Sequence, residues 1–203
     1  MLYAGMPSFP DRTRFFRFGP TPDRHILSLC LLAATIVAAG PTVLSAARLT
    51  LNISPCLPLG VYRLKSVPSS SEWKRGMLVE FCPPETNVVI AFARGRGWLG
   101  TNSGECPGGV LPLIKQVGAL PGDVVDVEPA GIRVNGHMIG NSAVVARSKA
   151  GSRIPHQPFG SQKLAPGEFF AVATHSAAAF DSRYFGPVPE SLVSARLTPV
   201  LTW

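Results

Sequence analysis

The sequence predicts a mainly β fold preceded by one N-terminal helix that spans a membrane or directs export. Three observations support this expectation. The 203 residues include 20 glycines and 20 prolines without a repeating period, a composition that favours short strands joined by turns. After residue 48 the apolar segments are short, as strands are. A single apolar segment near the N-terminus is long enough to cross a bilayer.

Composition and charge exclude several classes of protein. Hydrophobic residues make up 46% of the chain and charged residues only 15%, against about 25% in an ordinary soluble domain. These values exclude collagen, coiled coils and disordered tails. The 19 lysines and arginines outnumber the 12 aspartates and glutamates, which gives a net charge of +7. Because the basic residues are scattered and mostly lack aromatic neighbours, we expect no nucleic-acid partner.

The segment 26–47 is the predicted membrane helix. It contains no charged residue, and as a helix it would be about 33 Å long. The positive-inside rule places the N-terminus in the cytoplasm, because arginines precede the segment. These arginines are Arg12, Arg14, Arg17 and Arg24. We expect a cytoplasmic basic segment at 1–25, the anchor at 26–47 and an exported, periplasmic domain at 48–203.

A cleavable signal peptide is the alternative interpretation of this segment. Ser45, Ala46 and Ala47 resemble the small residues that precede a signal-peptide cleavage site. The apolar segment is long for a signal peptide, however, and it contains Pro41. An uncleaved anchor is therefore the preferred interpretation.

The exported part is long enough to bury one hydrophobic core, and its pattern is that of a β protein. Asn135 and Gly136 favour a tight hairpin, because an Asn-Gly pair accepts the positive φ that such a turn requires. A short helix is predicted at 87–94, and the segment 147–166, rich in Ser, Gly, Pro and basic residues, is predicted to be a mobile loop. The predicted strands are 60–64, 77–81, 111–117, 124–128, 132–134, 137–139, 168–174 and 197–201.

The cysteines fit an exported domain without a metal site. Cys30 lies in the apolar segment, where we expect it to pack as a small apolar residue. Cys82 and Cys106 lie in the exported part, where disulfides persist, and their spacing matches no zinc-ligand pattern. We predict a Cys82–Cys106 disulfide, no bound metal and no cofactor. Cys56 then keeps a free thiol, which in an oxidising compartment requires a reason.

Two segments carry residues suited to nucleophilic catalysis. In 52–62, two prolines and a glycine make a rigid turn that presents Ser54 and Cys56 close to the membrane segment. In 112–123, Lys115 is the only charged residue of an apolar strand. Burial disfavours the charged form of a lysine, and a neutral amine can act as a general base.

A third segment, 180–188, joins Asp181 and Arg183 to an aromatic turn. Each of the three segments alone has a purely structural interpretation. A lysine in an apolar strand usually extends its amine to solvent, Asp-Ser-Arg is usually a turn with a surface ion pair, and a single cysteine usually packs without reacting. Their occurrence together and in this order favours a functional site.

The three segments in this order resemble the exported serine/lysine peptidases of the signal peptidase type, and more narrowly the TraF-type proteins of conjugative plasmids. The resemblance extends from about Asn52 to Val200. It rests on NISPCLPLGVY, on PLIKQVGALPGD, on FDSRYFGPV and on the cysteines of EFCPP and GECPGG. It implies a signal-peptidase-like antiparallel β domain held at the periplasmic face of the inner membrane.

The resemblance also implies catalytic roles. Lys115 matches the general base of the family. Cys56 occupies the position at which the family has its nucleophilic serine. Ser54 matches the residue whose hydroxyl assists the backbone amide of the nucleophile in the oxyanion hole, a kind of donor worth about 3–4 kcal/mol in the transition state.

Two further features of the family concern the third segment. Asp181 and Arg183, with Ser182 between them, match a structural pair that supports the site. The residue two positions before Asp181 is usually a serine that orients the lysine amine, and here it is Ala179.

The cysteine and the missing serine leave several mechanisms open. A thiol has a reference pKa near 8.5, far below that of an alcohol, so it needs less help from a base, and a Cys/Lys peptidase is the preferred interpretation. A relative with a decayed active site is the alternative. A Ser54 nucleophile does not fit the motif spacing, and a Cys/His pair would use His175 or His156, which lie outside the family motifs. His137 is expected to be a surface residue of the hairpin.

The resemblance finally implies a reaction and partners. Proteins of the TraF type process the pilin precursor of the mating-pair apparatus, and in some systems they join the new C-terminus to the N-terminus. The expected partners are the pilin precursor, the inner membrane and other mating-pair formation proteins. A catalytically inactive scaffold that binds pilin and a general type I signal peptidase are the competing interpretations.

Overall fold

The computed structural model describes residues 24–85, 87–100, 104–148 and 151–203. The predicted cytoplasmic segment 1–25 lies outside these residues except for its last two. The chain divides into two units, with the boundary between Val43 and Leu44. This boundary lies a few residues before the predicted start of the exported domain.

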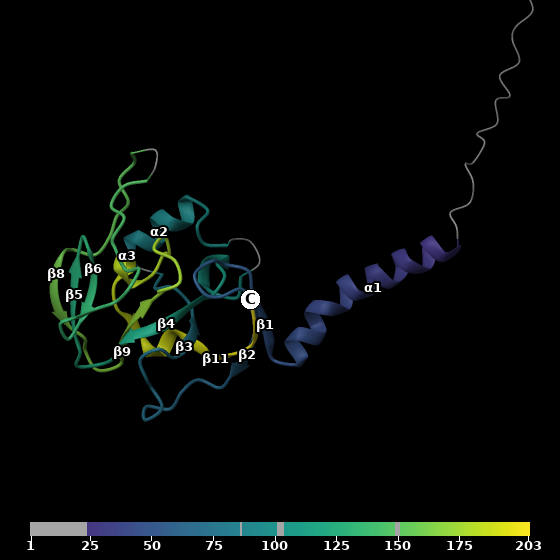
Figure 1. Cartoon of the computed structure of the whole chain (residues 1–203), viewed down its shortest axis with the longest axis horizontal. Helices are drawn as coiled ribbons and strands as arrows, with labels where there is room; N and C mark the ends of the chain where they lie inside the picture. The colour runs from purple at the N-terminus through teal and green to yellow at the C-terminus, as the bar shows by residue number, and fades with distance from the viewer. Residues whose placement is uncertain (1–23, 86, 101–103, 149–150) are drawn as a thin grey trace, which may run out of the picture. The chain divides into compact units, whose positions relative to one another are not determined.

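Helix α1 (Arg24–Ala46), drawn in purple in Figure 1, forms the predicted membrane segment. Its 23 residues are long and apolar enough to cross a membrane. Apolar side chains around the whole helix favour lipid over water. A helix of this kind near the N-terminus is consistent with a membrane-anchored or a secreted protein.

The larger of two sheets in the second unit has seven antiparallel strands in the order β1-β2-β11-β3-β4-β9-β10. The C-terminal strand β11 therefore lies between β2 and β3, so the two ends of the domain sequence meet in one sheet. The bounds of the seven strands are β1 Leu49–Asn52, β2 Gly60–Lys65, β3 Leu78–Phe81, β4 Leu113–Ala119, β9 Glu168–Val172, β10 Val188–Pro189 and β11 Val193–Thr202.

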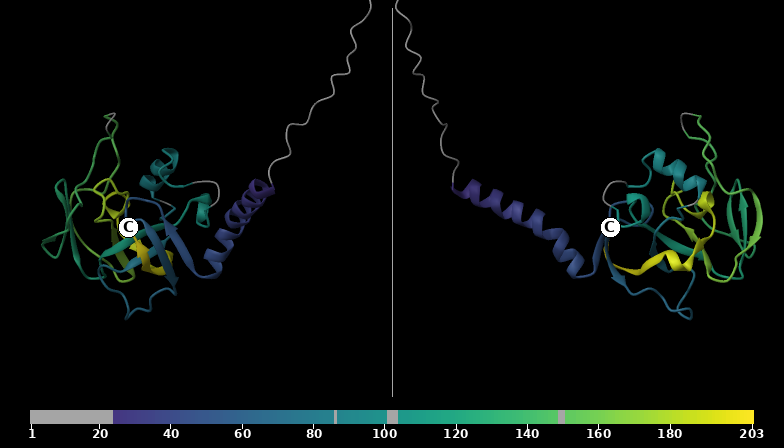
Figure 2. Two further views of the ribbon diagram at one scale, coloured as in Figure 1. Left: turned by 45° about the vertical axis from the view of Figure 1, so that its right-hand side comes forward. Right: turned by 180° about the vertical axis from the view of Figure 1, so that it is seen from behind.

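The smaller sheet has four antiparallel strands in the order β7-β6-β5-β8. Asn135 and Gly136 form the predicted turn between β6 and β7, with φ values of 50° and 81°. Figures 1 and 2 show this sheet at one side of the domain, beyond β4 and β9. The bounds are β5 Val124–Glu128, β6 Gly131–Val134, β7 His137–Met138 and β8 Gly160–Lys163.

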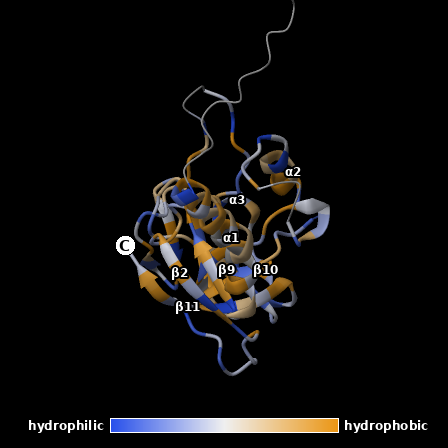
Figure 3. Ribbon diagram, turned by 90° about the vertical axis from the view of Figure 1, so that its right-hand side faces the viewer, coloured by the Kyte–Doolittle hydropathy of each residue, from blue (hydrophilic) through white to orange (hydrophobic). Residues whose placement is uncertain are grey.

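Short helices cover the face of the large sheet that points away from the small sheet. Helix α2 (Val88–Gly95) is the short helix predicted at 87–94, and Asn87 caps it, because the Asn87 side chain accepts a hydrogen bond from the Val89 amide. Figure 3 shows the orange apolar part of α2 and its blue basic part. The remaining helices are α3 Ser182–Phe185 and the 3₁₀ helices Pro107–Gly109 and Glu190–Leu192.

Strand β9 lies between two hydrophobic cores. Phe169 and Ala171 point into the core formed with α2 and α3, whereas Phe170 and Val172 point into the core formed with the small sheet. All four side chains are buried because successive residues of a strand point to opposite faces. Helices, large sheet and small sheet are thus three layers.

A bulge in β4 allows the strand to serve both cores. Val117 contributes to the first core and Ala119 to the second, although residues two apart in a regular strand share a face. The register against β9 shifts between these residues, at Gly118. A Cβ at Gly118 would come within 2.7 Å of the Val172 side chain, so a larger residue does not fit there.

Among the strands and α-helices, four were not predicted from the sequence. Strand β8 occupies part of the segment 147–166 that was expected to be a loop, and β1, β10 and α3 were not expected. The residues of β8 are polar because its side chains are mostly exposed, and it is held by backbone pairing with β5. Strands β1 and β10 and helix α3 are each four residues or fewer, too short for a periodic pattern.

Asp123 links the two sheets at the turn between β4 and β5. Although partial burial raises its pKa, hydrogen bonds from Arg75, the Leu120 amide and Asn135 hold the pKa of this carboxyl below its ordinary value. Asn135 belongs to the hairpin turn of the small sheet, so the ionised carboxylate fixes that turn to the end of β4.

We predict that Asp123→Asn weakens the acid dependence of stability. Because the pKa is lowered in the folded state, the stabilisation is present above the unfolded pKa, about 3.9, and is lost as the pH falls through the folded pKa. The variant should be less stable than the native chain at pH 7, with a smaller difference in strong acid. Urea unfolding of the full chain in detergent measures this. Asp126→Asn is the control, because Asp126 makes no side-chain hydrogen bond among the described residues.

Candidate active site

The segment that carries Ser54 and Cys56 is a loop between β1 and β2, held from inside by Asn52. The Asn52 side chain is 6% exposed. Its Nδ2 lies 3.0, 3.2 and 3.1 Å from the carbonyl oxygens of Ser54, Leu57 and Pro58, to which it donates. Its Oδ1 accepts from the Ser54 amide at 3.1 Å. One amide side chain therefore shapes the whole turn around Cys56.

The other side of this loop is fixed by Tyr62 and Leu57. Burial raises the pKa of Tyr62, and its hydroxyl donates to the Pro58 carbonyl at 2.7 Å. The Leu57 side chain is buried in the domain, whereas Ser54 is exposed and Cys56 half-buried. The loop thus buries its anchor and presents the hydroxyl and the thiol.

Lys115 lies in the middle of β4 on the face of the first core. It alternates with Leu113 and Val117, which pack against that core, and it is 4% exposed. Val79 of β3 is its cross-strand partner. The strand period therefore directs a lysine side chain inward among apolar neighbours.

One cavity of about 450 Å³ brings these residues together. Ser54, Cys56 and Lys115 all line it, together with Trp98, Phe180 and residues of β1 and β4. No hydrogen bond or ion pair of the Lys115 amine occurs within residues 24–85, 87–100, 104–148 and 151–203. Catalytic hydrogen bonds often tighten only when substrate is bound, so the shared cavity is the informative observation. We call it the reactive cavity.

A second cavity of about 450 Å³ continues from the reactive cavity and shares with it Ser54, Cys56, Trp98 and Phe180. Its lining is mostly apolar and includes Val145, Ile154 and Tyr184. The Trp98 and Phe180 rings contact each other at 5.9 Å between centroids. These two rings form an aromatic wall common to both cavities.

Asp181, Ser182 and Arg183 lie behind this wall and are completely buried. Arg183 forms a two-bond ion pair with Asp181, at 2.8 and 2.9 Å. Asp181 also accepts from the amides of Ala173 and Arg183, and Ser182 accepts from the Ala171 amide. The motif thereby attaches α3 to β9 and holds Phe180 in place.

The remaining Arg183 donors bind backbone carbonyls of two other segments. They reach the carbonyls of Ala177 and Ala179, and those of Asn141 and Ala143, at 3.0–3.2 Å. Residues 141 and 143 come shortly before Val145, which lines the second cavity. The Arg183 guanidinium thus fixes two loop segments, 141–143 and 177–179, that border the cavities.

The predicted Cys82–Cys106 disulfide is present. It closes a segment that contains α2 and Trp98, with a sequence separation of 24. A bridge around a loop of this length stabilises a fold by roughly 3 kcal/mol. The disulfide thereby restricts the segment that supplies Trp98 to the reactive cavity. Cys56 has a free thiol.

Comparison with known proteins adds to this geometry. Residues 24–203 match the family described as signal peptidase, peptidase S26. The chain belongs to this family. It is 36% identical to a plasmid transfer protein TraF of Escherichia coli over 172 residues, which cover 85% of this chain and 91% of that protein. The conjugal transfer protein TraF of Agrobacterium fabrum is 37% identical over 171 residues, or 84% of this chain and 92% of that protein.

A solved signal peptidase I from Enterococcus faecalis V583 aligns with 66% of this chain and all of its own, at 19% identity and a TM-score of 0.36. The fold described above rests on the sheet topology and not on this alignment. The family match and the TraF relatives show that the chain is a TraF-type member of the signal peptidase family, and its sheets are antiparallel.

Several candidate residues lie away from the reactive cavity. Neither His156 nor His175 lines either cavity that contains Cys56. His137 is exposed in the hairpin, as expected. No group of three or more His, Cys, Asp or Glu side chains that could hold a metal occurs among the residues that the structure describes.

Sequence reasoning missed three residues of the site. Asn52 stood in the first motif without a role, since its importance lies in backbone contacts that no local pattern reveals. Glu80 of β3 also lines the reactive cavity and accepts a hydrogen bond from the Ser194 hydroxyl at 2.7 Å. Trp98 reaches the cavity from a segment far along the chain, and only the fold brings it there.

We predict that Asn52→Ala lowers the free energy of unfolding by about 1–3 kcal/mol, because the buried Leu57 carbonyl and two partly buried carbonyls lose their donor. Asn52→Asp should cost a similar amount, since it keeps an acceptor for the Ser54 amide but loses the donating nitrogen. Urea unfolding of the full chain in detergent gives the values. Ser194→Ala, which removes an exposed hydroxyl, should change stability by less than about 0.5 kcal/mol. Equal effects of Asn52→Ala and Ser194→Ala would contradict the role assigned to Asn52.

Proposed function

We propose that the protein is a membrane-tethered periplasmic peptidase that processes a pilin precursor in conjugative transfer, with Cys56 as nucleophile and Lys115 as general base. The observation that carries the proposal is that Cys56, Ser54 and a buried Lys115 line one cavity. Membership of the signal peptidase family supports a peptidase-like hydrolase, and the relatives named TraF support a role in conjugation.

The first step forms an acyl-enzyme. The Cys56 thiol gives its proton to the Lys115 amine, and the thiolate sulfur attacks the carbonyl carbon of the scissile peptide bond. The resulting oxyanion accepts hydrogen bonds from the Ser54 hydroxyl and the Cys56 amide. The C–N bond then breaks, the leaving amine takes the proton from Lys115, and a thioester to Cys56 remains.

The second step releases the product. Water, or the N-terminal amine of the same pilin chain, attacks the thioester carbonyl and loses a proton to Lys115, and the thiol leaves with that proton. A thioester reacts with amines in preference to water more strongly than an ester does. The mostly apolar wall of Val145, Ile154 and the aromatic rings limits water, which favours the amine and hence a cyclic product.

Helix α1 and the charges that flank it support the proposed location. An apolar helix preceded by arginines holds the domain at the periplasmic face of the inner membrane. That compartment is oxidising, which agrees with the Cys82–Cys106 disulfide. The pilin precursor, itself a membrane protein in this proposal, then meets the reactive cavity at the same surface.

The first test is the pH dependence of Cys56 alkylation by iodoacetamide, in the full chain with Cys30→Ala. We expect Cys56 to react well below pH 8 and this reactivity to be lost in Lys115→Ala, since the amine takes the thiol proton. Lys163→Ala, which removes an exposed lysine of β8, is the matched control and should leave the profile unchanged. Slow alkylation that ignores Lys115 would instead favour an inactive scaffold that binds pilin, an interpretation supported by Ala179 in place of the orienting serine.

The second test is the product. The chain is expressed with the pilin precursor of its own transfer system, and the pilin is analysed by mass spectrometry. We expect a pilin that has lost its C-terminal tail and is one water lighter than the linear form of the same length. A linear product would retain the peptidase and exclude cyclisation, whereas an intact precursor, as with Cys56→Ala, would exclude processing. Cleavage of ordinary exported precursors would favour a general signal peptidase.

A further inference from the structure

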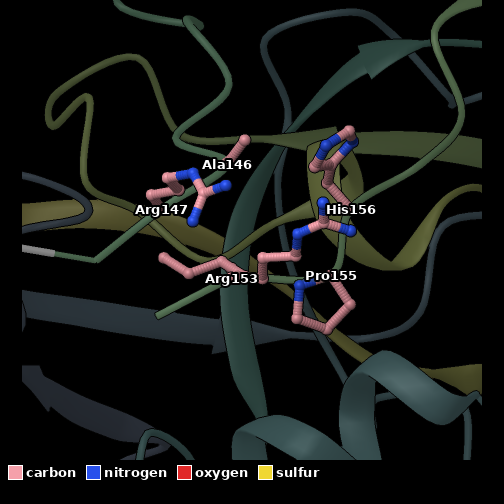
Figure 4. Close-up of a pocket in the computed structure, with 6 residues that line it drawn as sticks. Ala146, Arg147, Arg153, Pro155 and His156 are labelled. Atoms are coloured by element: carbon pink, nitrogen blue, oxygen red, sulfur yellow. The ribbon is translucent and has the colours of Figure 1, made fainter. Parts of the chain in front are cut away.

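A third cavity, of about 570 Å³, is lined by basic side chains. Its lining residues are Ala146, Arg147, Arg153, Ile154, Pro155 and His156. Figure 4 draws Arg147, Arg153 and His156 around this space. In Figures 1 and 2 the chain runs out from the domain before residue 149 and returns after residue 150. We call residues 145–148 and 151–157 the arm. We call this third space the basic cavity.

The positive charge of the basic cavity has no counterpart nearby in the sequence. Between Glu128 and Glu168 the chain has five lysines and arginines but no aspartate or glutamate. Among the described residues, Arg147 and Arg153 form no ion pair, and the single side-chain hydrogen bond of Arg147 goes to the Gly151 carbonyl. Both side chains are exposed. Two guanidinium groups are therefore free to bind an anion.

The basic cavity adjoins the apolar cavity that contains Cys56. Ile154 lines both the basic cavity and the apolar cavity shared with Cys56. Val145 lies in the other segment of the arm, across from Ile154, and it also lines the apolar cavity. The arm is paired across its width, with the Ile154 amide donating to the Ala146 carbonyl at 2.9 Å.

Tyr184 fixes the base of the arm to the site. Burial raises the pKa of Tyr184, so its hydroxyl stays protonated, and the hydroxyl oxygen accepts from the Val145 amide at 3.2 Å. On the other strand, the Gln157 amide donates to the Arg183 carbonyl at 3.0 Å. A peptide extended from Cys56 past Val145 and Ile154 would therefore reach Arg147 and Arg153.

We propose that the basic cavity is a subsite for a carboxylate of the substrate segment, either an aspartate or glutamate side chain or a free C-terminus. The inference rests on the proposed function, since it assigns specificity to the same site. Guanidinium groups bind carboxylates through paired hydrogen bonds. The position of the basic cavity next to the apolar cavity of Cys56, with Ile154 in both walls, favours a peptide over the phosphate of a lipid headgroup.

The test uses peptides that alkylate Cys56. The set consists of short alanine peptides that carry an iodoacetyl group at one end or the other. Each peptide has a single glutamate, whose position differs from peptide to peptide, and each has a matched peptide with glutamine at the same position. The full chain with Cys30→Ala is used in neutral detergent. At the favoured position we expect the glutamate peptide to alkylate Cys56 about tenfold faster than the glutamine peptide. This ratio should fall as salt is added.

Matched variants locate the effect. In Arg147→Gln/Arg153→Gln the ratio should fall to about one. The double variant Arg133→Gln/Lys163→Gln removes the same charge from the small sheet and should keep the native ratio. All-alanine peptides with a free or an amidated C-terminus separate the terminal carboxylate from the side-chain carboxylate.

Three results would overturn the subsite. These are a ratio of one for every peptide, a ratio that survives Arg147→Gln/Arg153→Gln, or an equal loss in the control variant. Phenylglyoxal labelling adds the lipid comparison: protection of Arg147 and Arg153 by phosphatidylglycerol, without any peptide preference, would assign the cavity to headgroups. If iodoacetamide alkylation is independent of Lys115, the proposed function fails; if only the peptide ratio is one, the subsite alone fails.

Discussion

Arg183 is a guanidinium without solvent contact in the middle of a small β domain. Taking such a charge out of water costs several kcal/mol, and the cost is offset only when the ion is paired and its other donors are bound. Here Asp181 supplies both carboxylate oxygens, and four backbone carbonyls take the remaining hydrogens. Removing either Asp181 or Arg183 would leave the other as an unpaired buried charge, which is strongly destabilising.

This ion pair supports the parts of the candidate site that carry Phe180 and Val145. Ser182 accepts from the Ala171 amide of β9 and Asp181 accepts from the Ala173 amide just after it, which positions Phe180 at the reactive cavity. Arg183 holds the segment that leads to Val145. The loop of Ser54 and Cys56 is fixed separately by Asn52, and Trp98 is held by the disulfide-closed segment. Ser54 and Cys56, Lys115 and the aromatic wall therefore come from independent elements, each with its own support. A site built in this way is rigid before substrate arrives, which is the condition for electrostatic preorganisation.

The cysteine at position 56 and the alanine at position 179 make one chemical pattern. An alcohol nucleophile needs a well-aligned base, and a serine beside the lysine would supply that alignment. A thiol ionises far more readily, so the demand on the lysine is smaller. Lys115 without a hydrogen-bonding partner in the described chain fits the smaller demand. Thioester chemistry then connects the same substitution to amine transfer, as proposed for cyclisation.

The strands with a clear alternation of apolar and polar residues were predictable from the sequence within about two residues at most ends. Strand β5 agrees at both ends, and the Asn135-Gly136 turn follows from local chemistry alone. The last strand begins at Val193, four residues before the prediction. Strand β8 was missed because its exposed polar residues carry no pattern and pair only through their backbone. The same limit applies to Asn52, whose partners are carbonyl groups, which every residue possesses.

The sequence by itself determined the apolar N-terminal helix, the disulfide, the β class and the short motifs that carry Ser54, Cys56 and Lys115. Each of these depends on residue type and on spacing along the chain. Only the tertiary structure decided that these motifs share a cavity, that Arg183 joins the arm to α3, and that Ile154 links the basic cavity to Cys56. Such relations depend on packing and hydrogen bonds between residues far apart in the chain. Local composition does not encode which of the many distant pairs will meet.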